Sequence, residues 1–366
     1  MRKSHNNLIL VFSLLILAAA LVACAAPAAE PEVVEVEVTR VVTETVEVEG
    51  ETVEVTRVVT ETETVTEVVT ETVTETEYVA AEPIIYNSMH SDEDPRANDE
   101  KLVAMWNEAH PEQQIQHSTI NHEDFKQAIR AYLVADPAPD VMTWFAGNRA
   151  RFFIDKGLIM DISDVWEEEG WNDAYPKGFR AMSEVDGNAY FMPTSWYWWA
   201  MFYRQSIFDE YGIEPPETFD ELLAACDTLN ENGIIPITIG TKYRWTAAAW
   251  FDYLNMRVNG PEFHRDLMLG KESYEDPRVK EVFNVWNQLF EHNCFIDDAA
   301  AYSWQEAVDP LNQGEAAMYL MGQFILDSVA EDVKDDMDFF QFPIIDPSVP
   351  IGEDAPTDGY FIANAA

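Results

Sequence analysis

From Pro83 onward, short apolar runs alternate with amphipathic segments, and this alternation restricts the possible fold more than any other feature. The apolar runs fit buried strands, at 84–88, 115–120, 140–146, 234–240 and 316–322. The segments between them fit helices with one apolar face, such as the one that carries Phe125, Ile129 and Leu133. Strands that alternate with helices predict an α/β fold in which helices cover a layered sheet.

Capping residues mark where several of these helices begin and end. Asn121 is placed to cap the helix that contains Phe125, and Thr218 with Glu221 forms a capping box. Ser303 with Glu306 forms another box, and a further helix is expected to begin near Gln323. We expect helix faces rich in large apolar residues to pack in the core: Leu102, Met105 and Trp106 in one helix, and Val279, Val282, Phe283, Trp286, Leu289 and Phe290 in another.

The chain has 366 residues, a length for which about two domains are expected. The α/β pattern occurs twice, with a break near residues 190–195. We therefore expect a first lobe at 83–192 and a second lobe at 193–341.

The first 24 residues have the pattern of an export signal. Arg2 and Lys3 precede an apolar run, which ends in small residues before Cys24. The sequence Leu21-Val22-Ala23-Cys24 resembles the lipobox of bacterial lipoproteins. That resemblance implies cleavage before Cys24, lipidation of its sulfur, and a lipid anchor on the outer face of the bacterial membrane. An uncleaved membrane anchor is the alternative.

Residues 25–82 consist mainly of Val, Thr and Glu. The sequence VEVTRVVTET occurs at 36–45 and again at 53–62, and the segment holds sixteen Glu against two Arg. So few bulky residues cannot form a core, so we expect a tether. The alternation of Val with Glu is compatible with transient strand structure, and the spacing of Val is compatible with a helical stalk.

The net charge of −45 argues against nucleic acid as a partner, because phosphate binding needs clustered Lys and Arg. No spacing of His, Cys or acidic residues suggests a metal site, and no cofactor motif is present. Besides Cys24, the chain has Cys226 and Cys294. A disulfide between them is possible, but Cys226 lies on an apolar helical face, which favours a buried free thiol.

Ligands of open α/β sheets bind beyond the carboxyl ends of the strands. This rule selects residues that follow the predicted strands or lie where the chain passes between lobes. Many are aromatic or hydrogen-bonding and few are basic, a composition that suits the C–H faces and hydroxyls of a sugar. The candidates are His90, Trp144, Asn148, Tyr197, Trp199, Tyr243, Trp245, Gln323, Phe324, Asp358 and Tyr360.

The run SWYWWAMFYR at 195–204 contains six aromatic side chains in ten residues. In a strand, neighbouring side chains point to opposite faces, and a sheet covered by helices buries both. Most of these rings are therefore expected in the core. Tyr197 and Trp199, which lie nearest the passage between lobes, are the best candidates for ligand contact.

Several motifs resemble family 1 extracellular solute-binding proteins, the receptors of bacterial carbohydrate ABC importers. Between residues 186 and 233 the matches are Gly187, Tyr190, Pro193, Phe202-Tyr203, Phe208, Gly212, Pro215-Pro216 and Thr218. Residues 139–141 and 314–318 match two further motifs of the family. Phe219 and Phe324 stand where the family usually has Trp, and Arg204-Gln205 where it usually has Asn-Lys. The resemblance covers about 83–366.

The resemblance implies a two-lobed, periplasmic-binding-protein-like fold of type II, with hinge strands and a cleft that closes on the solute. It implies a first lobe completed by about 342–366, and a second lobe whose last helices lie beyond the end of this sequence. It places Trp144, Tyr197, Phe324 and one of Tyr243 and Trp245 at the solute. It also implies a membrane permease as partner, and we expect a monomer.

Two other classes of function compete with a receptor. An exported glycosidase would also need aromatic platforms, together with two carboxylates that flank the scissile bond. A surface adhesion or structural protein would suit the Val/Thr/Glu segment but does not explain two α/β lobes. We therefore expect a receptor for a sugar or oligosaccharide and no enzymatic activity.

Overall fold

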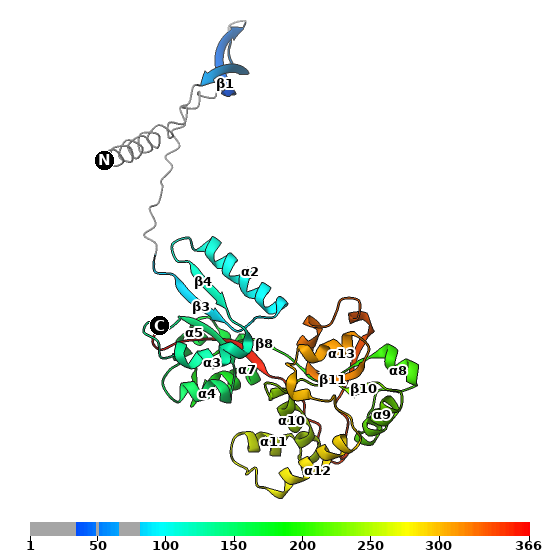
Figure 1. Cartoon of the computed structure of the whole chain (residues 1–366). Helices are drawn as coiled ribbons and strands as arrows, with labels where there is room; N and C mark the ends of the chain where they lie inside the picture. Colours follow the sequence, from blue (N-terminus) through cyan, green and yellow to red (C-terminus); the bar gives the residue numbers. More distant parts are fainter. Residues whose placement is uncertain (1–33, 49–50, 66–80) are drawn as a thin grey trace, which may run out of the picture. The chain divides into compact units, whose positions relative to one another are not determined.

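The computed structural model describes residues 34–48, 51–65 and 81–366 (Figure 1). Two separate units make up the chain, Met1–Glu77 and Tyr78–Ala366. The expected signal peptide and Cys24 lie outside the described residues, so cleavage and lipidation stay predictions.

The N-terminal unit contains one antiparallel pair of strands, β1 (Val34–Val48) and β2 (Glu51–Val65). Each strand contains one copy of the repeat, and Val41 pairs with Val58 at the equivalent position of the other copy. Of the alternatives left open for this segment, the structure therefore has the strand and not the helical stalk. The role as a tether stays a prediction.

The larger unit contains a five-stranded and a four-stranded sheet. In the first, β3 pairs in parallel with β4 and β5, while β13 pairs antiparallel with β5 and β8. The order is β4-β3-β5-β13-β8: β3 (Ile84–Ser88), β4 (Ile115–Thr119), β5 (Val141–Phe145), β8 (Met192–Trp196) and β13 (Thr357–Ile362). The second sheet has the order β10-β11-β9-β12: β9 (Trp199–Arg204), β10 (Ile235–Ile237), β11 (Ala316–Gly322) and β12 (Met337–Phe340).

The chain passes between these sheets twice within residues 81–366. Strand β8 lies in the first sheet and β9, three residues on, lies in the second, while the return runs between β12 and β13. Each sheet with its helices forms one α/β lobe, which confirms the expected fold class. The limits of the lobes stay a prediction. The first of them, between Met192 and Pro193, lies within β8 of the first sheet, and the second, after residue 341, follows β12.

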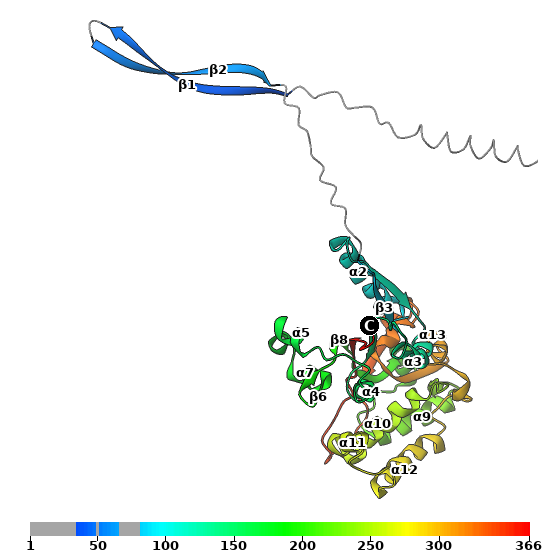
Figure 2. The same cartoon turned by 90° about the vertical axis from the view of Figure 1, so that its left-hand side faces the viewer.

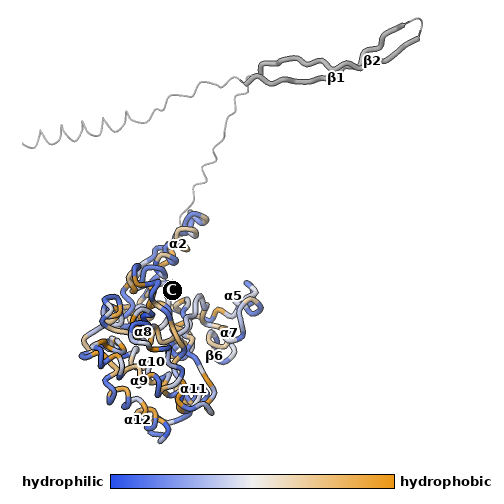
Figure 3. Tube along the Cα trace, turned by 90° about the vertical axis from the view of Figure 1, so that its right-hand side faces the viewer, coloured by the Kyte–Doolittle hydropathy of each residue, from blue (hydrophilic) through white to orange (hydrophobic). Residues whose placement is uncertain are grey.

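The helices of the first lobe come between β3 and β8. They are α2 (Glu93–Ala109), α3 (His122–Tyr132), α4 (Asn148–Ile154), α5 (Ser163–Glu168), α6 (Trp171–Ala174) and α7 (Lys177–Ser183), followed by the short strands β6 (Glu184–Val185) and β7 (Asn188–Ala189). Helices α5 and α7 and strand β6 form a small group at one side of the body in both Figure 2 and Figure 3. As expected, the Asn121 side chain caps α3 by accepting a hydrogen bond from the Glu123 amide.

The helices of the second lobe include α8 (Gln205–Tyr211), α9 (Phe219–Glu231), α10 (Trp245–Asn259), α11 (Pro261–Met268), α12 (Pro277–Glu291) and α13 (Asp309–Asn312). Four single turns of 3-10 helix complete the lobe, η1 (Ala299–Ala301), η2 (Glu306–Val308), η3 (Gln323–Asp327) and η4 (Lys334–Asp336). Both predicted capping boxes are present, but the helix expected from Gln323 is only the 3-10 turn η3.

Two apolar helix faces do not pack as predicted, although Figure 3 shows hydrophobic residues along both helices. In α2 only Asp99 is buried, while Leu102 and Met105 are more than half exposed. In α12 the buried residues are Val279, Val282, Val285 and Leu289, whereas Phe283 and Phe290 are exposed. The buried face of α12 includes Val285, and Phe283 and Phe290 lie outside this face. Trp106 and Trp286 are only partly buried.

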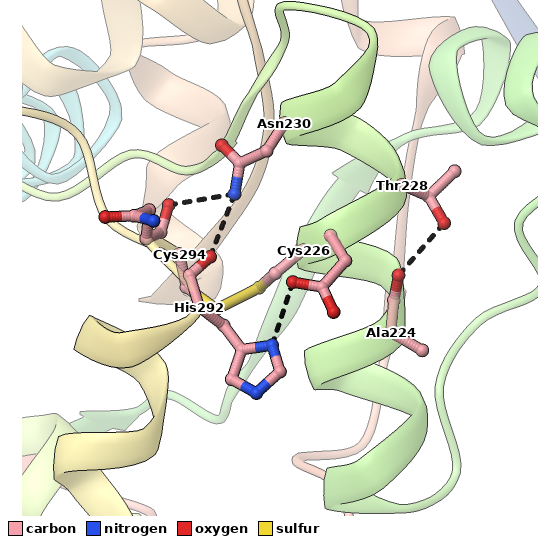
Figure 4. Close-up of a disulfide and its surroundings, with 8 residues drawn as sticks. Ala224, Cys226, Thr228, Asn230, His292 and Cys294 are labelled. Carbon is pink, nitrogen blue, oxygen red and sulfur yellow. Dashed lines mark hydrogen bonds and ion pairs between the residues drawn. A yellow bond between two sulfur atoms is a disulfide. The ribbon is translucent and has the colours of Figure 1, made fainter.

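Cys226 and Cys294 form a disulfide (Figure 4), so the expectation of a buried free thiol at Cys226 was wrong. The bond joins α9 to the segment after α12, and both cysteines are fully buried. At the same junction, the Asn230 side chain donates hydrogen bonds to the carbonyls of His292 and Asn293. The pairing depends on how α9 and α12 pack side by side, which spacing along the chain does not determine.

Replacement of both cysteines by serine is expected to lower the free energy of unfolding of the second lobe by about 2–4 kcal/mol, since a bond that closes a loop of this length restricts the unfolded chain. Cys226 and Cys294 lie 68 positions apart in the sequence. Denaturant unfolding of the variant and of the wild type under non-reducing conditions measures the difference. Equal midpoints would contradict a disulfide in the native protein.

Candidate ligand-binding site

A cavity of about 1120 Å³ lies at the edges of the two sheets and is lined from both lobes. The first lobe contributes residues that follow β3 and β5, and the second contributes residues that follow β11 and the start of α10. Strand β13 and both passages between the sheets also reach its wall. The carboxyl ends of parallel strands gather their following loops at one edge of a sheet, which explains why this wall combines segments distant in sequence.

Phe324 is the centre of a group of aromatic rings in the cavity wall. Its centroid lies 5.3 Å from that of Tyr197, 5.9 Å from Trp199 and 5.2 Å from Trp304, in each case with the planes nearly perpendicular. A Cβ at position 322 would lie only 2.2 Å from this ring, so glycine is required there for Phe324 to occupy its place. The rings stabilise each other edge to face and leave an apolar surface for a ligand.

Most of the residues selected from the sequence lie in the cavity wall. They are His90, Tyr197, Trp199, Trp245, Gln323, Phe324, Asp358 and Tyr360. A role of these residues in binding stays a prediction. Of the rings in the run at 195–204, Trp199, Phe202 and Tyr203 are buried, and Tyr197 and Trp198 are partly buried against the same core. Trp196 is 52% exposed.

Three selected residues do not line the cavity. Trp144 lies on β5 with its ring in the first-lobe core, against Phe125 and Phe153. Because side chains alternate along a strand, its neighbour Phe145 lines the cavity instead. Asn148 and Tyr243 are exposed outside the cavity, and the wall is formed by Arg149 and Trp245. In each case a residue one or two positions along the chain lines the cavity, and a role of the three selected residues in binding stays a prediction.

Several polar residues of the wall were not predicted from the sequence, including Asp252, Asp354 and Lys126. For Asp252 a signal was present. Trp245, Ala248, Ala249 and Asp252 have the spacing of one face of a helix, and all four line the cavity from α10. Once Trp245 was selected, this spacing pointed to Asp252.

Asp99 holds a polar cluster together at the edge of the cavity. Its carboxylate accepts hydrogen bonds from Tyr86 (2.6 Å), Ser88 (2.6 Å) and Tyr360 (3.0 Å), and His90 Nδ1 lies 3.0 Å away. Burial opposes ionisation, but the contacts with His90, Ser88 and Tyr86 nevertheless hold the pKa of Asp99 below its usual value. The cluster therefore orients His90 and Tyr360 and attaches α2 to the sheet by a charged group.

Several other carboxyl groups in the wall have raised pKa values, among them Asp358 and Asp252. Burial raises the pKa of Asp358 to about 6, although His90, Arg149 and Lys126 oppose the shift. Burial, together with the nearby Asp354, raises the pKa of Asp252 to about 7. One oxygen of Asp358 has no hydrogen-bond partner among the described residues, nor has the indole nitrogen of Trp199. Both atoms are buried, and a buried polar atom without a partner destabilises the fold.

The part of the chain that the structure describes contains no group of three His, Cys, Asp or Glu that could hold a metal ion. Over the same residues, no helix is both long enough and apolar enough to cross a membrane.

Asp252 is expected to make stability fall as the pH rises. A carboxyl whose pKa is raised in the folded state stabilises the fold below its usual pKa of about 4, and this contribution is lost as the pH passes about 7. Asp252→Asn is neutral throughout, so the variant should equal the wild type near pH 4 and exceed it at pH 8, by on the order of 1–3 kcal/mol.

Melting temperatures of both proteins between pH 4 and pH 8 test this expectation. The exposed Asp332, replaced by Asn, is the matched control because it lies outside the cavity. Parallel curves for Asp252→Asn and the wild type would contradict the raised pKa.

Two α/β lobes with a cavity walled by both define a two-lobed ligand-binding protein. Residues 91–366 match the model of the bacterial extracellular solute-binding protein family, and the chain belongs to this family. The resemblance inferred from the sequence motifs is thereby confirmed.

Relatives with known names are similar over part of their length. An uncharacterised ABC transporter extracellular-binding protein of Pyrococcus horikoshii is 29% identical over 55% of this chain and 46% of its own length. A probable sugar-binding periplasmic protein of Mesorhizobium japonicum is 24% identical, over 54% and 47%. The chain spans about half the length of these curated relatives.

Among solved structures, the bacterial solute receptor AcbH is 31% identical, with a TM-score of 0.71 over 78% of this chain and 72% of that chain. AcbH is described as preferring β-D-galactopyranose exclusively. A protein studied for xylan utilisation by Caldanaerobius polysaccharolyticus has a TM-score of 0.72 at 23% identity, over 77% of this chain and 73% of that chain. This second likeness shows the fold alone.

Proposed function

We propose that this chain is the receptor of a carbohydrate importer, which binds a sugar or oligosaccharide in the cavity between its lobes. The observation that carries the proposal is the cavity wall, which combines aromatic rings from both lobes with the polar side chains of His90, Asp252 and Gln323. The C–H faces of a sugar pack on such rings, and its hydroxyls form hydrogen bonds with such polar groups. A bound ligand would favour closure of the lobes, because only the closed form lets it contact the walls of both lobes at once.

The relatives support this class of ligand. One is a probable sugar-binding periplasmic protein, one is the receptor described for β-D-galactopyranose, and a third is the melibiose/raffinose/stachyose-binding protein of Bacillus subtilis, which is 21% identical over 68% of this chain. None of these proteins is described as an enzyme. The competing interpretation as a glycosidase therefore has no observation in its favour beyond the abundance of carboxylates.

The proposal includes a place and a partner. The protein would be held on the outer face of the membrane by lipid on Cys24 and would deliver its solute, as a monomer, to the permease of an ABC transporter. The disulfide Cys226–Cys294 supports an extracytoplasmic location, because such bonds persist in oxidising compartments.

A panel of mono- and oligosaccharides, tested by thermal shift and then by titration calorimetry, is expected to contain at least one ligand that raises the melting temperature. A ligand present at about 100 times its Kd should add about 2.7 kcal/mol to stability. Chromatography of the recovered sugar should show no product. Hydrolysis of the bound sugar would favour the glycosidase, and the absence of any binding saccharide would overturn the proposal.

Trp196 provides a test of the cavity itself, because its ring lines the wall while remaining 52% exposed, so its removal should spare the core. Trp196→Ala is expected to weaken sugar binding by about 1–3 kcal/mol, as the loss of an aromatic contact does. Tyr243→Ala is the matched control, since this ring is 41% exposed and lies outside the wall. Equal effects of the two substitutions on affinity would place the sugar elsewhere.

A further inference from the structure

A side-chain hydrogen bond in the cavity wall connects the two lobes. The indole nitrogen of Trp245 donates to Oε1 of Glu123, at 3.1 Å. Trp245 is the first residue of α10, between strands of the four-stranded sheet, and Glu123 is the second residue of α3, between strands of the five-stranded sheet. Donor and acceptor therefore belong to different lobes, and separation of the lobes breaks the bond.

The first lobe holds Glu123 in a fixed position. Its amide donates to the capping side chain of Asn121 at 3.0 Å, and its carboxylate pairs with Lys126 at 2.7 Å. Both side chains of this pair are mostly buried, with 16% of each exposed. A carboxylate in the first turn of a helix also interacts favourably with the helix dipole. The acceptor is therefore in place before the indole of the other lobe arrives.

The second lobe packs the Trp245 ring, but the hydrogen-bond partner of its indole nitrogen belongs to the other lobe. The ring packs against Trp199 at 5.9 Å, Phe324 at 6.3 Å and Trp304 at 6.4 Å, apolar contacts that do not satisfy the indole nitrogen. A hydrogen-bond partner stabilises a buried indole nitrogen, and the partner that Trp245 has comes from the first lobe. The Lys126 ammonium also lies 5.7 Å from the ring centroids of both Trp245 and Phe145, so the same ion pair contacts aromatic walls of the two lobes.

We propose that Glu123 is a positioning residue, which fixes the Trp245 ring in the cavity wall only when the lobes are closed and thereby stabilises the closed form. The inference rests on the proposed receptor function, since it concerns the same cavity. It adds that part of the closing free energy comes from a contact between the lobes, independent of the ligand.

The first test uses the ligand-free full-length protein, so that it does not depend on knowing the sugar. Hydrogen–deuterium exchange is measured at residues 122–132 and 245–252 in the wild type, in Glu123→Ala and in Trp245→Phe, which keeps a ring but removes the N–H. Both variants are expected to exchange several-fold faster in these segments, because the closed form is less populated. Glu331→Ala removes a comparable i,i+3 pair with Lys334, at 2.8 Å on the surface, and should leave this exchange unchanged.

A double-mutant cycle separates positioning from a merely structural role. With a sugar found in the panel, Glu123→Ala and Trp245→Phe should each raise Kd about 5- to 20-fold through faster dissociation, as expected for a lost hydrogen bond to a charged group. The double variant should be no weaker than the weaker of the two single variants. Glu123→Gln, whose amide oxygen still accepts from the indole, should recover most of the affinity.

Each outcome decides the inference. Independent, additive effects of the two substitutions, or unchanged exchange in the ligand-free variants, would overturn it even if sugar binds normally. If no saccharide binds, the receptor proposal fails, while the exchange experiment still decides whether Glu123 holds the lobes together.

Discussion

The arrangement of the body depends on one constraint, which is the burial of the aromatic run that passes from the first sheet into the second. Strand β9 lies between β11 and β12, and its residues Trp199 to Tyr203 are buried on both faces. Strand β8, three residues earlier in the chain, is the edge strand of the first sheet. Because β9 is fixed in one core and β8 is paired in the other sheet, the two sheets must meet near Tyr197 and Trp198. The cavity lies where they meet.

Charge within this cavity is distributed in a way that composition alone does not indicate. A chain with net charge −45 has many exposed acids, whose contribution is mainly to solubility. The acids of the cavity differ because they are buried, and their neighbours decide in which direction the pKa moves. Hydrogen-bonding side chains hold the pKa of Asp99 below its usual value, whereas burial, together with the nearby Asp354, raises the pKa of Asp252 to about 7. Asp99 thus holds its neighbours together as a charged carboxylate, whereas Asp252 is a carboxyl group that, when protonated, can donate as well as accept a hydrogen bond.

The fold and the loops of the site were predictable because strand geometry fixes them. Parallel strands bring their carboxyl ends together, so the positions after 84–88 and 140–146 had to meet at one edge of the first sheet, and those after 234–240 and 316–322 at one edge of the second. The choice between Trp144 and Phe145 was not predictable, since both faces of a covered strand are apolar and the sequence does not show which face borders the cavity. The disulfide Cys226–Cys294 and the exposed face of α12 were missed for a related reason, because both depend on how helices pack against each other.

The α10 helix shows how one element serves both stability and recognition. Its buried residues, among them Trp250, Tyr253 and Leu254, belong to the second-lobe core, and the Tyr253 hydroxyl donates to the backbone carbonyl of Trp199 at 3.1 Å. Its other face presents Trp245 and Asp252 to the cavity. A shift of the helix that repacked its core would therefore move a ring, a carboxyl group and the neighbouring Trp199 together. The position of this part of the cavity wall is therefore coupled to the packing of the second-lobe core.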